Sequence, residues 1–305
     1  MAVKIATSPL DNLLVMEAPA QELVVADETG SEEGRAVSEE LYWAEYYDRG
    51  DFSYEWNNGI LEVKPVSDYA QFRLYLWFIS LIHDFLHVQP IGRMIGLDTG
   101  FRMDLPHRTT IRKPDLGVVL NSNPVALGDK DRSYHGIFDL CIESLSDSDK
   151  REVERDTKTK KEEYAQAGVT EYFILDENGR ETMFYRLNEK GFYVPIQPHN
   201  GVIQSSVLQG FQFRVADLYR LPEPPQLIND AVYNSFASPF VRAERLLREQ
   251  EQQRAEEERR HAEEERQRAN QEQQRADQEH QRAEQEKKRA DHYASLLKSL
   301  GFNTN

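Results

Sequence analysis

The chain has 305 residues, 39% of them apolar, and a formal net charge of −16. This charge excludes a surface that is basic throughout, but it leaves room for a local basic groove, because contacts to nucleic-acid phosphates come from Lys and Arg. The single cysteine, Cys141, excludes an intramolecular disulfide, fits a reducing compartment and lies in an apolar run where a packed core thiol is expected.

Residues 1–37 combine scattered apolar positions with an acidic, Gly-containing stretch, and they are predicted to form a poorly ordered arm. This arm lacks the basic start and the continuous apolar core of a signal peptide, and the chain has no run of 18 apolar residues. We therefore expect a cytoplasmic protein without a membrane partner. One ordered domain is predicted over 38–221.

The first half of this domain is predicted to contain both helices and strands. Ser38 is expected to cap a short helix, and the turn signal Asn58-Gly59 indicates a hairpin within YEWNNGILEVKP. Apolar residues at spacings of three and four predict a long helix over 68–87. Strands are expected over 93–103, 112–120 and 137–145.

In the second half, a helix over 156–168 ends at Gly168, and a strand over 171–176 follows. A hairpin is expected from 182–187 and 191–195, with further short strands up to residue 221. This order predicts an α/β fold in which a mixed sheet core is flanked by helices.

Beyond a Pro-containing linker over 222–239, residues 240–300 are predicted to form a long charged helix. Its alanines recur every seven residues, but the positions that would complete a coiled-coil seam are mostly Glu. Many Glu–Arg pairs lie three or four residues apart, which stabilises an isolated helix. We predict a solvated single helix that serves as a spacer or an arm for a protein partner. The alternative is a weak coiled coil, with a homo-oligomer formed through 293–300.

Two acidic residues accompany strands that otherwise have a core composition. Asp115 follows Pro114 at the start of one apolar strand, and Glu143 lies inside another. Burying a carboxylate is costly unless it is paired or bound to a metal, and two of them on neighbouring strands could hold Mg²⁺, which prefers oxygen ligands. A nearby Lys could orient the attacking water or stabilise charge on a phosphate. The spacing alone equally allows solvent-facing positions at strand ends.

The sequence blocks PDLGVV, IESLSDSD, DTKTKKEEYAQAGV and EYFILD, in this order, resemble the Uma2 family of predicted endonucleases within the PD-(D/E)XK superfamily. The resemblance covers about 38–221, and it implies a restriction-endonuclease-like core, a Mg²⁺ or Mn²⁺ cofactor and hydrolysis of DNA phosphodiester bonds. By this resemblance Asp115 and Glu143 are the metal ligands and catalytic acids. Lys160 is the catalytic lysine, with Lys158 and Lys161 as competing candidates.

The chain departs from the superfamily at residue 145, where Leu145 stands in place of the expected lysine. Several further residues have two interpretations each. Asp156 either serves the site or caps its helix, Asp68 or Glu62 could add a metal ligand, and the remaining candidates are expected to have packing or surface roles: Tyr164, Tyr172, His83 and His87.

Two functions follow. The first is a metal-dependent DNA endonuclease, a hydrolase, in which Asp115 and Glu143 converge within about 4–6 Å and Lys160 points toward them. The second is a catalytically silent nuclease-fold protein that binds partners through its helical arm. The negative charge and Leu145 favour the second, whereas the presence of the three candidate site residues favours the first.

Overall fold

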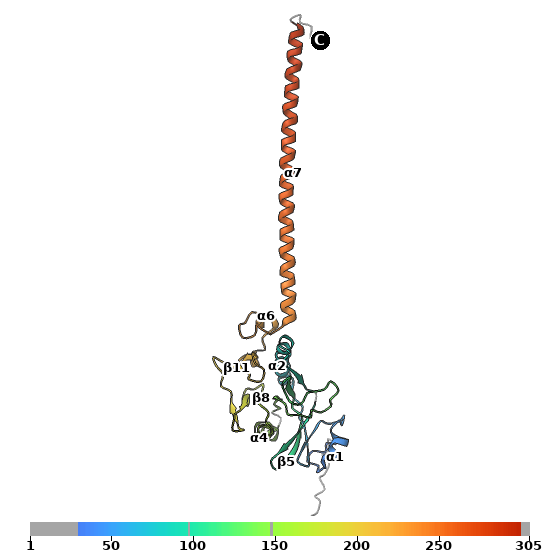
Figure 1. Ribbon diagram of the computed structural model, residues 1–305, viewed down its shortest axis with the longest axis vertical. Helices are drawn as coiled ribbons and strands as arrows, with labels where there is room; N and C mark the ends of the chain where they lie inside the picture. The colour runs from blue at the N-terminus through green and yellow to red at the C-terminus, as the bar shows by residue number, and fades with distance from the viewer. Residues whose placement is uncertain (1–29, 97, 147–148, 300–305) are drawn as a thin grey trace, which may run out of the picture. The chain divides into compact units, whose positions relative to one another are not determined.

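The computed structural model describes residues 30–96, 98–146 and 149–299. Contacts within the chain divide it into two compact units, Met1–Ala237 and Ser238–Asn305 (Figure 1). The first unit holds the candidate site and is built from short helices and strands. The second unit is dominated by a single long helix, so we describe each unit by itself.

The helices and helical turns of the first unit are α1 (Glu39–Leu41), η1 (Tyr42–Tyr46), α2 (Tyr69–Val88), α3 (Lys150–Glu154), η2 (Arg155–Lys160), α4 (Lys161–Ala167), α5 (Asp217–Arg220) and α6 (Pro224–Leu227). Its strands are β1 (Tyr54–Asn57), β2 (Ile60–Val63), β3 (Gly92–Ile95), β4 (Phe101–Leu105), β5 (Arg108–Arg112), β6 (Leu116–Leu120), β7 (Leu140–Ser144), β8 (Glu171–Leu175), β9 (Met183–Leu187), β10 (Tyr193–Pro195), β11 (Val202–Gln204) and β12 (Gln212–Arg214). The predicted α/β class is confirmed.

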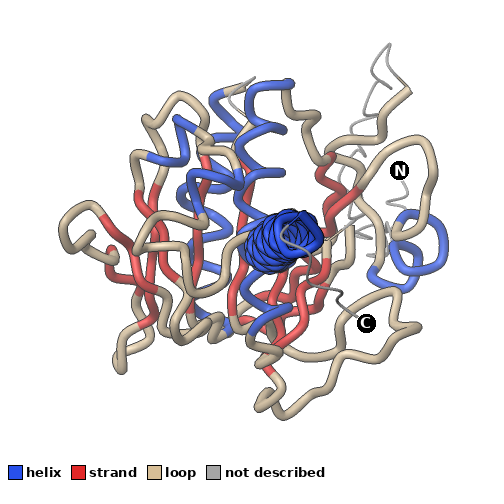
Figure 2. Tube along the Cα trace, turned by 90° about the horizontal axis from the view of Figure 1, so that it is seen from above, coloured by secondary structure: helices blue, strands red, loops and turns tan. Residues whose placement is uncertain are grey.

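A six-stranded sheet, in the order β10-β9-β8-β7-β6-β3, forms the centre of this unit. Strands β7 and β8 are parallel, and the other pairs are antiparallel. Residues alternate between its two faces: Leu140 and Ile142 pack with α2, whereas Cys141 packs in the cluster that contains Tyr164 of α4. The sheet is buried on both faces, which explains the continuous apolar runs of β7 and β8. Figure 2 shows the strands flanked by helices and loops.

A second sheet of four strands, in the order β2-β1-β5-β4, lies in the same unit. The hairpin of β1 and β2 has the predicted turn at Asn58 and Gly59, and both residues have positive φ (48° and 96°). This backbone conformation favours Asn and Gly over other residues. Strand β1 brings the acidic residue Glu55 into the interior, where it is fully buried.

Two of the predicted strands, 93–103 and 112–120, differ from the observed ones. The first is broken into β3 and β4, which belong to different sheets. The second begins later than predicted, as β6 at Leu116, and overlaps β5 of the other sheet only at Arg112. Pro114 lies between β5 and β6, and it has no N–H to continue a ladder. The chain therefore changes sheets immediately before Asp115, which leaves this residue outside both ladders.

The predicted helix over 156–168 begins earlier than expected, at Lys150, and Asp149 is its N-cap. The interpretation of Asp156 as an N-cap is therefore wrong, since Asp156 lies within the wide turn η2 and is buried. The helix ends as predicted at Gly168, which has φ +92°.

Two segments that were predicted to lie outside the domain contribute to its core. Within 222–239, the predicted linker, the side chains of Leu227, Tyr233 and Phe236 pack into the cluster around α2. Val37, at the end of the predicted arm, is buried in the cluster of β1 and η1. Residues 30–36 of the arm are also described, and Ala36 forms a bridge with Ile60 of β2. Residues 1–29 lie outside the described residues, and the domain boundaries stay a prediction.

The predicted charged helix is present as α7 (Pro239–Ser299), which runs without a break (Figure 1). None of its described residues is buried, and pairs such as Arg248–Glu244 lie along its surface. Its oligomerisation stays a prediction. Among the described residues, none of the helices combines the length and the apolar composition that crossing a bilayer requires.

We expect Ala276→Pro to interrupt α7 while leaving the unfolding midpoint of the first unit unchanged. Pro costs about 3 kcal/mol within a helix, but α7 has no buried residue whose packing would be lost. Circular dichroism of the full chain should lose helix signal, and Trp fluorescence, which reports only on the first unit, should give the same urea midpoint as the wild type. A shifted midpoint would contradict this independence.

Candidate active site

Asp115 lies between β5 and β6, at the point where the chain passes from one sheet to the other. Its Oδ1 is 3.0 Å from the Nζ of Lys64, and its Oδ2 accepts a hydrogen bond of 2.7 Å from the backbone N–H of Ser144. Tyr75 of α2 donates to the backbone carbonyl of Asp115 at 2.6 Å. Two contacts thus hold the carboxylate and a third holds the backbone, yet a quarter of the side chain remains exposed.

Glu143 lies on β7 and is almost completely buried. Its Oε1 accepts a hydrogen bond of 2.7 Å from the hydroxyl of Tyr164 and is 3.2 Å from the Nζ of Lys160. Both of these contacts fall on Oε1, and among the described residues no hydrogen-bond donor reaches Oε2. One carboxylate oxygen of Glu143 is therefore fixed and the other has no protein partner within that part of the chain.

Lys160 points toward Glu143, as predicted, and lies among three carboxylates. Its Nζ is 3.2 Å from Oε1 of Glu143, 3.2 Å from Oδ1 of Asp156 and 3.3 Å from Oε1 of Glu55. Burial by itself would lower the pKa of Lys160, but these three negative charges outweigh it and raise that pKa above its usual value. Lys160 is therefore charged at neutral pH and is 1% exposed.

The two competing lysines have different surroundings. Lys158 is largely exposed and pairs with Glu154 at 3.1 Å, one helical turn away. The Nζ of Lys161 lies 4.2 Å from the ring centre of Tyr185. Of the three lysines on this helix, only Lys160 contacts a predicted site residue.

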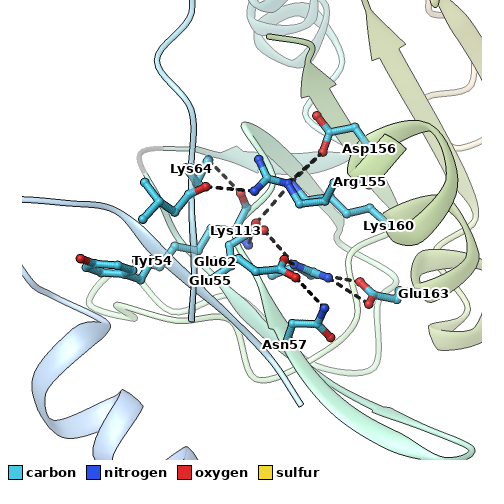
Figure 3. Close-up of polar contacts among 12 residues, drawn as sticks. Tyr54, Glu55, Asn57, Glu62, Lys64, Lys113, Arg155, Asp156, Lys160 and Glu163 are labelled. Atoms are coloured by element: carbon cyan, nitrogen blue, oxygen red, sulfur yellow. Dashed lines mark hydrogen bonds and ion pairs between the residues drawn. The ribbon is translucent and has the colours of Figure 1, made fainter. Parts of the chain in front are cut away.

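Behind Lys160, a buried network joins the hairpin to the helix (Figure 3). Arg112 of β5 is fully buried, and its guanidinium contacts Glu163 at 2.6 and 3.0 Å, Glu55 at 3.1 Å, and Glu62. Four acidic side chains from β1, β2, η2 and α4 thereby meet two cations, Arg112 and Lys160. The sequence interpretation missed Glu55 and Arg112. Glu55 stands between Tyr54 and Trp56 in β1, whereas the polar sequence of β5, RTTIR, gives no local signal for Arg112.

The side chain of Asp115 faces a pocket of about 240 Å³. Polar residues and two aromatic side chains from α2 line this pocket: Lys64, Ser67, Phe72, Tyr75, Asp98, Asp115 and Ser144. Glu143 and Lys160 are not among the lining residues. The predicted trio therefore divides into a partly exposed residue, Asp115, and a buried pair, in which Glu143 lies on β7 and Lys160 on η2.

The family described as "Uma2: Putative restriction endonuclease" matches residues 39–216, which is more than half of the chain. The chain belongs to the Uma2 family. The match covers every residue of the candidate site and ends before α7.

Solved structures include a chain that is similar to this one. It is described as a "putative nuclease belonging to DUF820 from Anabaena variabilis ATCC 29413", is 16% identical in sequence, and matches over 57% of this Uma2 chain and 93% of its own length with a TM-score of 0.45. Comparison with curated proteins gives no match.

The other candidate residues of this Uma2 chain have structural partners. Asp68 caps α2, since its Oδ1 accepts from the backbone N–H of Gln71 at 2.9 Å. Glu62 forms an ion pair with Arg112 and accepts a hydrogen bond of 2.6 Å from the side-chain amide of Asn57. Within the described ranges, no three side chains of His, Cys, Asp or Glu lie together in a way that would hold a metal ion.

Burial raises the pKa of Glu143 to about 8, against the opposing effect of Lys160. A carboxyl group with a raised folded-state pKa binds a proton in the folded state but not in the unfolded state between its two pKa values, so stability falls as pH rises through that window. Glu143 therefore contributes a loss of stability from about pH 4.5 up to about pH 8, with a slope of at most about 1.4 kcal/mol per pH unit.

We expect wild type to lose stability relative to Glu143→Gln when the pH is raised from 5 to 9 in EDTA. Gln keeps the shape of the side chain but does not titrate, so the difference between the two proteins isolates this group. Urea unfolding at each pH measures it. A difference in free energy of unfolding that is constant over this range would contradict the raised pKa.

Proposed function

We propose that the first unit is a divalent-metal-dependent endonuclease that hydrolyses DNA phosphodiester bonds. The observation that carries this proposal is the pairing of Asp115, on a pocket open to solvent, with the buried Glu143 on the adjacent strand. In the antiparallel pair of β6 and β7, Leu116 lies opposite Ile142. Asp115 precedes Leu116 and Glu143 follows Ile142, so the two acidic residues occupy neighbouring positions at the same end of this strand pair. Membership of a family described as restriction endonucleases supports the same reaction.

The donor chemistry at this position suits Mg²⁺ or Mn²⁺. Asp115 and Glu143 offer hard carboxylate oxygens, and Oε2 of Glu143 has no donor partner among the described residues. The ammonium group of Lys64, next to Asp115, contacts three oxygen atoms, which is expected at a position that accommodates a cation. Asp115 and Glu143 would hold the ion, which supplies Lewis-acid polarisation of the phosphate and lowers the pKa of a bound water.

The protein's own residues prepare the carboxylates. The Ser144 N–H fixes Oδ2 of Asp115, and Tyr164 fixes Oε1 of Glu143, so both side chains have a defined orientation before any ligand arrives. Lys160 contacts Oε1 of Glu143 from inside the protein. Because Lys160 is buried behind three carboxylates, its geometry supports a positioning role for Glu143.

The second candidate is a catalytically silent nuclease-fold protein that binds partners through α7. It is supported by the full exposure of α7 and by the hydrophobic residue Leu145, buried where the superfamily would have a lysine. Exposed Tyr293, Leu296 and Leu297 near the end of α7 would serve such a partner or a second copy.

Cleavage of supercoiled plasmid DNA by the full chain, with Mg²⁺ or Mn²⁺ and with EDTA as control, separates the two candidates. We expect metal-dependent nicking for the endonuclease. A chain that is folded by circular dichroism, binds Mn²⁺ and still leaves plasmid and single-stranded DNA intact would favour the silent protein.

A further inference from the structure

The ammonium group of Lys64 lies in a cradle of three oxygen atoms. Its Nζ donates to the backbone carbonyl of Lys113 at 2.8 Å and to Oδ1 of Asp115 at 3.0 Å, and it lies 3.3 Å from Oδ1 of Asp98. An ammonium group has three N–H donors, of which two make these hydrogen bonds, and Asp98 adds an ion pair. Only 12% of the Lys64 side chain is exposed, which makes this an internal ion cluster at the pocket wall.

The three acceptors of this cradle are two carboxylates and one backbone carbonyl. These are ligand types that Mg²⁺, Mn²⁺ and Ca²⁺ take in proteins. One of them, Asp115, is also the exposed carboxylate of the proposed site. A divalent ion at Asp115 and the Lys64 ammonium thus require the same carboxylate oxygen, Oδ1, and the two cations repel each other at such distances.

We propose that Lys64 is a tethered competitor of the divalent cation, which binds Asp115 only by displacing the lysine ammonium, with Asp98 as an additional ligand. This inference rests on the metal requirement of the proposed function. It assigns roles to two residues, Lys64 and Asp98, whose side chains come from the loops after β2 and β3.

Deprotonation of Lys64 is not an alternative way to free Asp115 from the lysine ammonium. Burial alone would lower the pKa of Lys64, but Asp115, Glu143 and the other nearby carboxylates outweigh burial and raise that pKa above its usual value. The lysine is therefore charged throughout the neutral range. Occupancy of the cradle is decided by competition between cations, and it depends on divalent-ion concentration more than on pH.

The exposed half of Asp98 supports its assignment as a ligand. Half of its side chain is exposed on the same pocket as Asp115, and its backbone has φ +63°. A carboxylate that is partly solvated keeps an oxygen available to an ion that also retains waters, as Mg²⁺ usually does.

The test is calorimetric titration of the full chain with Mn²⁺ alone, without DNA. We expect Lys64→Met to bind Mn²⁺ at least about tenfold more tightly than wild type, because the competing charge is removed and an apolar side chain of similar length fills its place. Asp98→Asn should bind at least about tenfold more weakly. Lys64→Arg, which keeps the charge, should stay close to wild type.

Lys161→Met is the matched control. Lys161 is also a lysine, but its Nζ lies 4.2 Å from the ring centre of Tyr185, and the residue does not line the pocket. Its Mn²⁺ affinity should stay within about twofold of wild type. A gain as large as that of Lys64→Met would reduce the effect to general electrostatics and overturn the inference.

The remaining outcomes distinguish this inference from the proposed function. Binding that Asp115→Asn abolishes but that Lys64→Met leaves unchanged would overturn the role of Lys64 and keep the metal site. Absence of binding in wild type and Lys64→Met alike, up to about 10 mM Mn²⁺, would overturn both. Should Lys64→Met fail to fold without metal, Lys64→Gln, which is polar and uncharged, replaces it with the same expectation.

Discussion

Asp115→Asn is expected to reduce metal-dependent cleavage of plasmid DNA at least about 100-fold. A metal ion contributes several kcal/mol to stabilising the charge of the transition state, and each 1.4 kcal/mol corresponds to a factor of ten in rate. Asn keeps the size of the side chain and can still accept from the Ser144 N–H, but it loses the charge that an ion at the pocket requires. Glu143→Gln should have an effect of the same order.

Asp104→Asn is the matched control for this experiment. Asp104 lies on β4, is largely exposed and pairs with Arg102, away from the pocket residues. Its cleavage rate should equal that of wild type. Cleavage that persists undiminished in both Asp115→Asn and Glu143→Gln would remove the proposed site, whatever the activity of the wild type.

Lys160→Met is expected to lower the free energy of unfolding by about 3–5 kcal/mol. Removing one partner of a buried ion pair leaves the other charges buried without compensation. Here one ammonium contacts three carboxyl groups within 3.3 Å, and all three, those of Glu55, Glu143 and Asp156, lie almost wholly out of solvent. Urea unfolding followed by Trp fluorescence measures the loss.

Lys158→Met provides the comparison on the same helix. Its pair with Glu154 is exposed, and exposed pairs of this spacing contribute about 0.3–0.5 kcal/mol. The stability of this variant should stay within about 0.5 kcal/mol of wild type. If the free energy of unfolding of Lys160→Met lies within about 1 kcal/mol of the wild-type value, the buried cluster relaxes or becomes hydrated without this lysine, and the prediction is wrong.

The difference between these two lysines illustrates how far the sequence interpretation reached. Resemblance to Uma2 selected Lys160 over Lys158 and Lys161, and the contact with Glu143 at 3.2 Å agrees with that choice. Burial, however, depends on what packs over the helix. The covering residue Glu55 lies more than a hundred positions earlier in the chain, so local spacing carries no information about it.

Strand boundaries show a similar limit. The apolar runs around 93–103 and 112–120 predict β structure correctly, because residue type and alternation are local properties. Which sheet β3 and β5 join depends on hydrogen bonds to β6 and β1, which are distant in sequence, whereas the pairing of β5 with β4 is a local hairpin. The break before Asp115 follows from that choice of partners, although Pro114 at the break is visible in the sequence.

By itself, the sequence determined the α/β class, the hairpin at Asn58-Gly59, the long helix α2 and the charged helix α7, since each follows from a local pattern of turns, apolar spacing or charge. It also determined the family and the pairing of Asp115 with Glu143 as candidates. Only the tertiary structure decided that Asp115 lies on the pocket and Glu143 behind it, and that Lys64 holds the exposed carboxylate. The physical reason is that the exposure of a charge, and the choice of its counter-ion, depend on segments brought together by folding and not on the neighbours of a residue along the chain.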